Sequence, residues 1–292
     1  MGLSVGILGL PNVGKSTIFN ALTNASVASE NYAFCTIEPN HGIVDVPDVR
    51  LAQINRYINT EKIISNSVEF VDIAGLVKGA SKGEGLGNKF LSHVRDVDAL
   101  VHVLRCFHND DISHVDGDVN PVRDIETINT ELILKDIETI EKRIHNVCKI
   151  AKSGNKDAKK ELEFLEFLLD ELNKENLISE LELDATKQKC LKSFALLTSK
   201  PMIYVANVSE NALVDKKNPY LNELSSYVTS KNKSLVILCG AIEMEISIMP
   251  TDEQEEFLDS YGLNESGLNI MIRHAYQLLN LETFFTAGPK EI

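Results

Sequence analysis

A glycine-rich loop near the amino terminus carries residue types that can bind a polyphosphate. Residues 9–16 read GLPNVGKS, which matches the pattern G-x-x-x-x-G-K-[ST]. The two glycines allow backbone N–H groups to turn inward around phosphates, and Lys15 can place a positive charge on the β- and γ-phosphates. An apolar run at 3–8 supplies the strand that the motif requires, and the helical pattern that follows predicts a helix beginning near Lys15. We predict phosphate contacts from Asn12, Val13, Gly14, Lys15, Ser16 and Thr17.

A magnesium ion bound to these phosphates needs oxygen ligands from the protein. The Ser16 hydroxyl can supply one, and Asp72, at the end of an apolar run, can hold the ion through water. Thr36 lies in a polar loop and can add its hydroxyl when the γ-phosphate is bound. Gly75 follows Asp72 in the pattern D-x-x-G and can offer its N–H to the γ-phosphate. Alone, Asp72 would indicate a turn and Thr36 the start of a strand. Beside the phosphate loop, we predict that Ser16, Thr36 and Asp72 bind magnesium.

The composition is that of a folded chain without export or membrane signals. The 292 residues are 43% hydrophobic, which suits one large domain or two modest ones. No run approaches about twenty apolar residues, and the first residues lack the basic region of a signal peptide. The five cysteines never form C-x-x-C, which argues against a disulfide framework or a zinc site. We predict a cytoplasmic monomer without a membrane partner.

The charge restricts the contacts that the chain can make with nucleic acid. A formal net charge of -14 repels nucleic acid at long range, so any RNA contact needs a local basic patch. We expect no DNA partner.

A helical period replaces the strand pattern between Ile125 and about Leu197. Apolar residues spaced alternately by three and four form two runs: Ile133, Ile137, Ile140, Ile144, Val147 and Ala151, then Leu162, Leu165, Leu169 and Leu172. Ser153, Gly154 and Asn155 separate the runs, so we predict an antiparallel coiled-coil hairpin. Positive residues gather near its tip: Lys142, Arg143, Lys149, Lys152, Lys156, Lys159 and Lys160. They form either a solvated face balanced by nearby glutamates or a contact with RNA.

Five stretches together resemble the YchF, or Obg-like ATPase, branch of the Obg-type translation-factor GTPases. They are GLPNVGKST (9–17), FCTIEPN (34–40), DIAGLVKGASKGEGLGN (72–88), NVSE (207–210) and CGAIE (239–243). The similarity runs along the whole chain. It implies a Mg²⁺-dependent nucleotide hydrolase that prefers ATP, has a GTPase fold and associates with ribosomes through the large subunit. It also raises K⁺ as a further cofactor.

The stretch NVSE lies where a guanine-reading GTPase has N-K-x-D. There the aspartate accepts hydrogen bonds from guanine N1–H and the N2 amine, whereas this chain has Val208 in place of the lysine and Glu210 in place of the aspartate. The longer carboxylate is misplaced for that pair of bonds, and a buried pair left partly unmade costs about 1 to 3 kcal/mol. We predict that ATP is preferred to GTP, with use of both left open. The predicted base-contacting residues are Asn207, Val208, Glu210, Cys239, Gly240 and Ala241.

The residue that orients the attacking water in many GTPases is absent, since Leu76 stands where a glutamine follows D-x-x-G. Either turnover is slow or another group acts. His114, in the loop at 107–121, matches a family histidine linked to hydrolysis, although a loop histidine can equally be a solvated surface residue. His102 alternates within a strand and is expected in the core. The glycine-rich segment 76–90 is predicted to be a switch loop that orders around the γ-phosphate. We predict Lys15 and His114 as catalytic residues.

The pattern of elements predicts a P-loop α/β fold with a mainly parallel sheet, helices on both faces and an inserted helical hairpin. The expected boundaries are a nucleotide-binding domain at 1–124 and 201–280 and the hairpin at 125–200. The family resemblance further implies that 281–292 is the first strand of a truncated C-terminal TGS domain. The leading functional hypothesis is an ATPase that acts as a switch on the translation machinery. The alternative is a nucleotide-sensing binding module with negligible turnover.

Overall fold

The computed structural model describes residues 3–28, 40–58, 60–73, 86–115, 117–215, 218–279, 281 and 283–292. The chain divides into two compact units. Unit 1 comprises Met1–Gly75, Val97–Val122 and Met202–Ile292, and unit 2 comprises Leu76–Asp96 and Arg123–Pro201. In the described residues, no helix combines the length and the apolar content that a membrane span needs.

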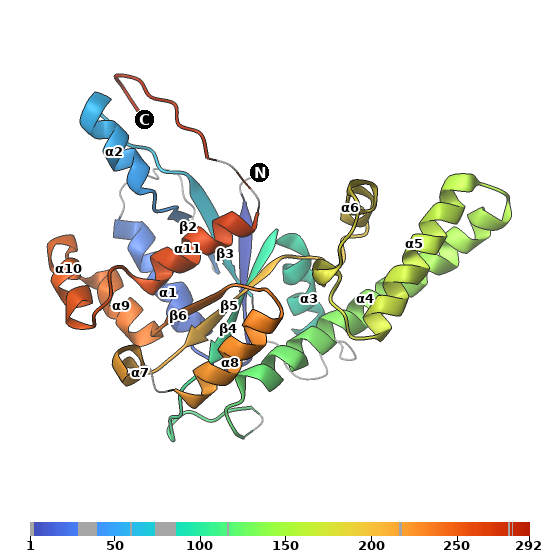
Figure 1. Cartoon of the computed structure of the whole chain (residues 1–292), viewed down its shortest axis with the longest axis horizontal. Helices are drawn as coiled ribbons and strands as arrows, with labels where there is room; N and C mark the ends of the chain where they lie inside the picture. Colours follow the sequence, from blue (N-terminus) through green and yellow to red (C-terminus); the bar gives the residue numbers. More distant parts are fainter. Residues whose placement is uncertain are drawn as a thin grey trace. The chain divides into compact units, whose positions relative to one another are not determined.

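A six-stranded sheet forms the centre of unit 1 (Figure 1). Its strands are β1 (Ser4–Leu8), β2 (His41–Asp45), β3 (Ser67–Asp72), β4 (Ala99–Arg105), β5 (Met202–Asn207) and β6 (Leu235–Leu238). Their order in the sheet is β2-β3-β1-β4-β5-β6. Only β2 and β3 pair antiparallel among these neighbours, and the other four pairs are parallel. The prediction of a mainly parallel sheet is therefore confirmed.

The inner strands are buried along their whole length, which explains their uninterrupted apolar sequences. Every residue of β4 and β5 is buried, as are the last four residues of β1. Continuous Val, Ile and Leu runs are typical of parallel strands covered on both faces. Because the parallel strands point the same way, the polar residues that follow them gather at one edge of the sheet.

Seven helices of unit 1 surround the sheet in the described residues. They are α1 (Lys15–Ala28), α2 (Val49–Ile58), α7 (Glu210–Asp215), α8 (Pro219–Ser230), α9 (Gly240–Ile248), α10 (Thr251–Ser260) and α11 (Gly267–Leu278). Helix α1 packs against α9 and contacts β1, β2 and β3, while α11 contacts β4, β5 and β6. These contacts fix the starts of α1 and α9 close to the strand ends.

Unit 2 is helical in its described part. Its elements are α3 (Leu86–Asp96), α4 (Pro121–Lys152) from its third residue onward, α5 (Lys156–Asn173), the short 3₁₀ helix η1 (Ile178–Glu180) and α6 (Ala185–Lys192). The break between α4 and α5 lies at the predicted place. Gly154 has a positive φ of 94°, which favours glycine, and the Asn155 side chain caps α5 by accepting from the N–H groups of Asp157 and Ala158.

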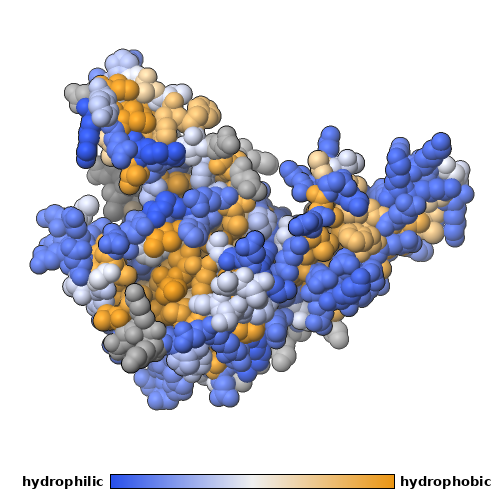
Figure 2. Space-filling model, viewed as in Figure 1, coloured by the Kyte–Doolittle hydropathy of each residue, from blue (hydrophilic) through white to orange (hydrophobic). Residues whose placement is uncertain are grey.

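The two long helices of unit 2 share one apolar core and run side by side (Figure 1). Every residue of both predicted runs is buried in this cluster or packed against it. Whether the pair has the knobs-into-holes packing of a coiled coil stays a prediction. On the face seen in Figure 2, hydrophilic residues cover most of the free end of the pair.

A buried carboxylate fastens α4 to the segment that follows α6. Asp136 is 1% exposed and accepts three hydrogen bonds, from the N–H of Leu197 at 2.9 Å and from the N–H and hydroxyl of Thr198, both at 2.7 Å. Burial raises the pKa of Asp136 even though these bonds oppose the shift. The contact closes the helical unit just before the chain returns to β5.

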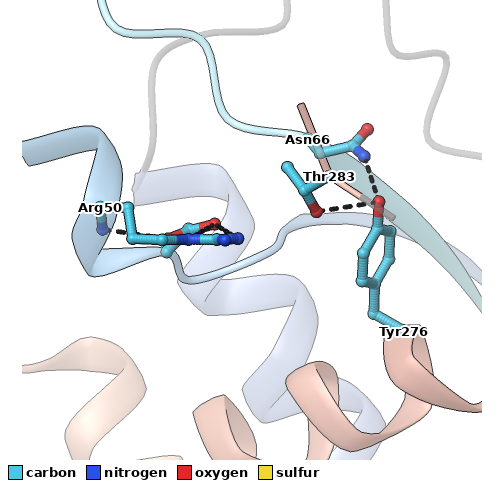
Figure 3. Close-up of polar contacts among 5 residues, drawn as sticks. Arg50, Asn66, Tyr276 and Thr283 are labelled. Atoms are coloured by element: carbon cyan, nitrogen blue, oxygen red, sulfur yellow. Dashed lines mark hydrogen bonds and ion pairs between the residues drawn. The ribbon is translucent and has the colours of Figure 1, made fainter. Parts of the chain in front are cut away.

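The carboxyl-terminal residues differ from the strand that we predicted. The described residues of 281–285 form no strand, and the tail instead folds onto unit 1. There Asn66 donates a 2.8 Å hydrogen bond to the Tyr276 hydroxyl, which Thr283 also contacts (Figure 3). Ile292 exchanges backbone hydrogen bonds with Lys62 and Ile64. The strand was expected from the family resemblance, whereas the backbone of Ile292 bonds Lys62 and Ile64, which are far away in the sequence.

Candidate nucleotide-binding site

The loop between β1 and α1 has the backbone shape that its glycines allow. Gly14 has a φ of 93°, and a Cβ atom there would overlap the side-chain amide of Asn207. A Cβ atom at Gly9 would lie 2.7 Å from the carbonyl oxygen of Val103. Both positions therefore require glycine, and Asn12 adds a second positive φ of 64° between them. The result is a tight, fixed loop that ends at the start of a helix.

The first turn of α1 presents groups suited to a polyphosphate. The helix begins at Lys15, as predicted, and has no acidic residue in its first turn. Ser16 and Thr17 are the second and third residues of this helix. Ser16 is exposed and Thr17 is half-buried. Val13 is different, because its side chain is buried at 1% exposure and only its backbone can face a ligand. The free N–H groups and positive dipole end of this turn, next to Lys15, suit an anion.

Lys15 and Asp72 form an ion pair in this structure. Strands β1 and β3 are in register with Ile7 beside Asp72, which brings the end of β3 next to the phosphate loop. The two side chains are largely buried, with 10% and 15% of their surfaces exposed. The predicted phosphate-binding lysine and the predicted magnesium-binding carboxylate therefore lie together. Thr36, Gly75 and Leu76 fall outside the described residues.

Asn207 links the phosphate loop to the loop after β6. It lies at the end of β5 and is 4% exposed. Its side-chain N–H donates to the Val13 carbonyl at 2.9 Å, and its side-chain oxygen accepts from the Gly240 N–H at 2.9 Å. The amide is thus occupied by two protein partners. We predicted Asn207 as a nucleotide contact, and no sequence pattern indicated that it also bridges two loops.

The remaining predicted base contacts surround Asn207. Val208 is buried, and its N–H donates to the Leu238 carbonyl at 2.9 Å, so this N–H is committed within the protein. Cys239 is the N-cap residue of α9, and burial raises the pKa of its thiol. Gly240 and Ala241 form the first turn of that helix, with Ala241 exposed. The structure brings these residues together at one edge of the sheet.

Glu210 has a partner that sequence reasoning missed. It is the first residue of α7, and its carboxylate accepts a 2.5 Å hydrogen bond from the hydroxyl of Tyr261 at the end of α10. The bond to Glu210 raises the pKa of Tyr261 to about 12. No sequence pattern links the two residues, which are 51 positions apart.

His114 lies in a loop that is held against the phosphate loop. The side chain of Asn12 donates to the carbonyl of Ser113, the preceding residue, at 3.2 Å. His114 is 8% exposed, so it is not a solvated surface residue. By contrast, the side chain of His108 in the same loop is 68% exposed. The two histidines of this loop therefore differ in exposure: His114 is buried and His108 is exposed.

A buried arginine shapes this loop. Arg105 ends β4 at 1% exposure and donates to the carbonyls of Phe107 at 3.0 Å, Asn109 at 3.2 Å and Ile112 at 3.0 Å. Its guanidinium also lies 4.8 Å from the centre of the Phe107 ring. We did not select Arg105 from the sequence. A charged residue at the end of the apolar run ALVHVL was the available signal.

His102 is a core residue, as expected. It is fully buried in β4, where its ring centre lies 5.8 Å from that of Tyr204. Burial lowers the pKa of His102 to about 3, so the ring is neutral at ordinary pH.

Comparison with known proteins places these features in context. Residues 4–142 match a family model described as 50S ribosome-binding GTPase. Proteins named Ribosome-binding ATPase YchF are similar over the full chain: the one from Bacillus subtilis is 51% identical and the one from Pasteurella multocida 50%, and each match covers 80% of the relative. A solved structure of the Schizosaccharomyces pombe YchF GTPase superposes with a TM-score of 0.89 at 36% identity, covering 99% of this chain and 79% of that one.

Proposed function

This chain belongs to the YchF family, and from that premise we propose that it is a cytoplasmic Mg²⁺-dependent ATPase that forms ADP and phosphate. The observation that carries the proposal is the pairing of Lys15 with Asp72 beside a loop whose glycines cannot be replaced. Bacterial relatives that are named ATPases support it. The nucleotide-binding domain is proposed to comprise 1–124 and 201–280.

At the phosphate end, side chains and backbone groups of the phosphate loop bind and orient the triphosphate. On binding the nucleotide, Lys15 would exchange the Asp72 carboxylate for phosphate oxygens, which would leave Asp72 and the exposed Ser16 hydroxyl to hold a magnesium ion. The bound ion supplies a counter-charge to the β- and γ-phosphates. Thr36 and Gly75 complete this proposed set. Thr17 and the backbone of residues 12–14 hold the phosphates in place.

The base end supports a preference for ATP. With its N–H committed to Leu238, Val208 offers a carbonyl, which can accept from the N6 amine of adenine but would face the O6 oxygen of guanine. The relatives' names differ on the nucleotide, since the fission yeast structure is described as a GTPase. Direct binding measurements with both nucleotides therefore decide this part of the proposal.

We assign His114 to the hydrolysis step, as the group that orients or deprotonates the attacking water. Its support is its burial and the contact between Ser113 and Asn12, which holds its loop against the phosphate loop. The decisive variants are His114→Ala and, as a matched control in the same loop, the exposed His108→Ala.

Phosphate release from ATP and GTP, measured with Mg²⁺, with and without K⁺ and ribosomes, tests the proposal. We expect His114→Ala to lower the turnover number about 100-fold or more while leaving ATP affinity unchanged, and His108→Ala to behave as wild type. Full turnover in His114→Ala would refute the assignment of His114. Tight ATP binding by the wild type without phosphate release in any condition would favour a nucleotide-sensing module instead.

The helical hairpin is proposed to contact the large ribosomal subunit. Lys142 pairs with Glu138 at 2.5 Å and Arg143 with Glu161 at 2.7 Å, whereas Lys149, Lys152, Lys156, Lys159 and Lys160 are exposed around the tip. The relatives' name, which includes ribosome binding, supports this assignment. Because phosphate contacts release counterions, the binding should weaken steeply with salt.

A charge-matched pair of variants tests the hairpin. Changing Lys152, Lys156 and Lys159 to glutamate should strongly weaken co-sedimentation with ribosomes and make the remaining binding less dependent on salt. The same change at Lys187, Lys189 and Lys192, which are exposed on α6 of the same unit, should have a much smaller effect. Equal losses from both variants would indicate net charge alone and reject the tip as the contact.

A further inference from the structure

The bond between Tyr261 and Glu210 occupies the carboxylate that a guanine-reading GTPase keeps for the base. Glu210 holds the position of the aspartate in N-K-x-D, and one of its carboxylate oxygens accepts from the Tyr261 hydroxyl at 2.5 Å. Reading guanine requires both oxygens of that carboxylate, one for N1–H and one for the N2 amine. An oxygen already bonded to a tyrosine hydroxyl pairs less well with either donor.

Tyr261 is fixed beside the base end of the site by other contacts. It caps α10, and its N–H donates to the Leu258 carbonyl at 3.1 Å. Its ring lies 5.3 Å from that of Phe257, measured between ring centres. The Cys239 thiol, next to the start of α9, lies close enough to Glu210 for the carboxylate charge to raise its pKa further, after burial. The hydroxyl is therefore placed among the predicted base contacts.

We propose that Tyr261 determines nucleotide specificity, because it holds Glu210 in a hydrogen bond that competes with guanine. This role rests on the proposed function and makes adenine the base that the proposed site accepts. Adenine does not need this carboxylate, since it has no N1–H and no N2 amine. The bond consequently disfavours GTP and leaves ATP unaffected.

The test compares Tyr261→Phe with Tyr276→Phe by calorimetric titration of ATP and GTP with the full chain. Tyr261→Phe removes the hydroxyl and keeps the ring against Phe257. Tyr276→Phe also removes a bonded hydroxyl, but one that contacts Asn66 and Thr283. We expect Tyr261→Phe to strengthen GTP binding about two- to tenfold with ATP binding unchanged, and Tyr276→Phe to leave the ratio of the two affinities as in wild type.

Two further variants separate specificity from a purely structural link. Tyr261→Phe combined with Glu210→Asp, which restores the shorter carboxylate, should favour GTP more than either change alone. Glu210→Gln removes the charge and should not strengthen GTP binding. Unchanged affinity ratios in both Tyr261→Phe and the double variant, or a wild type that prefers GTP, would overturn the inference while nucleotide binding stands. A wild type that binds neither nucleotide would overturn the proposed function itself.

Discussion

The phosphate end and the base end of the candidate site differ in how closely their residues keep to the known motifs. At the phosphate end, the motif residues occupy the positions that their types require: Gly14 has a positive φ, α1 starts at Lys15, and Lys15 meets Asp72. At the base end, the residues that correspond to a guanine-reading motif are bonded to other parts of the protein. Asn207 bridges Val13 and Gly240, and Glu210 is bonded to Tyr261.

The difference reflects what each end must recognise. A polyphosphate is identified by charge, so one arrangement of N–H groups, lysine and magnesium ligands serves every nucleoside triphosphate. A base is identified by the order of its hydrogen-bond donors and acceptors, so a small change in the protein groups that face it alters which nucleotide is preferred. We therefore expect substitutions at the phosphate end to remove binding of all nucleotides and those at the base end to change their ranking.

The largest expected effect is at the phosphate end. Lys15→Ala should lower the affinities for ATP and GTP equally, by about 100-fold or more, because it removes the charge that neutralises the phosphates. Calorimetric titration with non-hydrolysable analogues measures both affinities, and substitution of the exposed Lys62 of unit 1 by alanine is the control. A Lys15→Ala protein that keeps its purine nucleotide affinity would remove the basis of the whole site.

A smaller effect is expected at Asn207, which joins the two ends. Asn207→Ala leaves the Val13 carbonyl and the Gly240 N–H without their partner. It should therefore lower the free energy of unfolding by about 2 kcal/mol and lower the affinities for ATP and GTP about tenfold. Asn218→Ala is the matched control, because Asn218 is also buried and bonds the Cys106 carbonyl at 2.6 Å. It should destabilise the fold without changing nucleotide affinity. Equal effects of the two variants on affinity would show that Asn207 acts only through stability.

The smallest expected effect is that of pH on the base end. The pKa of Tyr261 is raised to about 12, above its value of about 10 in the unfolded chain. The stabilisation from the protonated hydroxyl is therefore complete below about pH 10 and is lost as the pH rises toward about 12. Between about pH 6.5 and about pH 8.5 the ratio of ATP to GTP affinity should stay constant. A ratio that changes across this range would point to a different titrating group.

Much of the fold could be predicted, because its signals are local. The apolar runs gave the strands, the phosphate motif gave the start of α1 at Lys15, and Gly154 marked the break between α4 and α5. The tail lacks, in its described residues, the strand that the family resemblance implied at 281–285. Its described residues instead bond Lys62, Ile64 and Tyr276.

The site was predictable only where a motif carries its own geometry. The phosphate residues share one continuous stretch, so their spacing determines their arrangement. The contacts of Asn207, Arg105 and Tyr261 depend on how distant segments meet in the sheet and helices, and one sequence contains no pattern for that. These contacts therefore had to be found in the structure.

Arg105 donates all three of its hydrogen bonds in this loop to main-chain carbonyls, at Phe107, Asn109 and Ile112. Every amino acid has that carbonyl, so the identity of the loop residues matters little to their attachment. The fork of five donors on the guanidinium, in contrast, has no substitute among other side chains. Tolerance of substitution should thus be high at Asn109 and Ile112, which Arg105 holds by backbone groups, and very low at Arg105 itself.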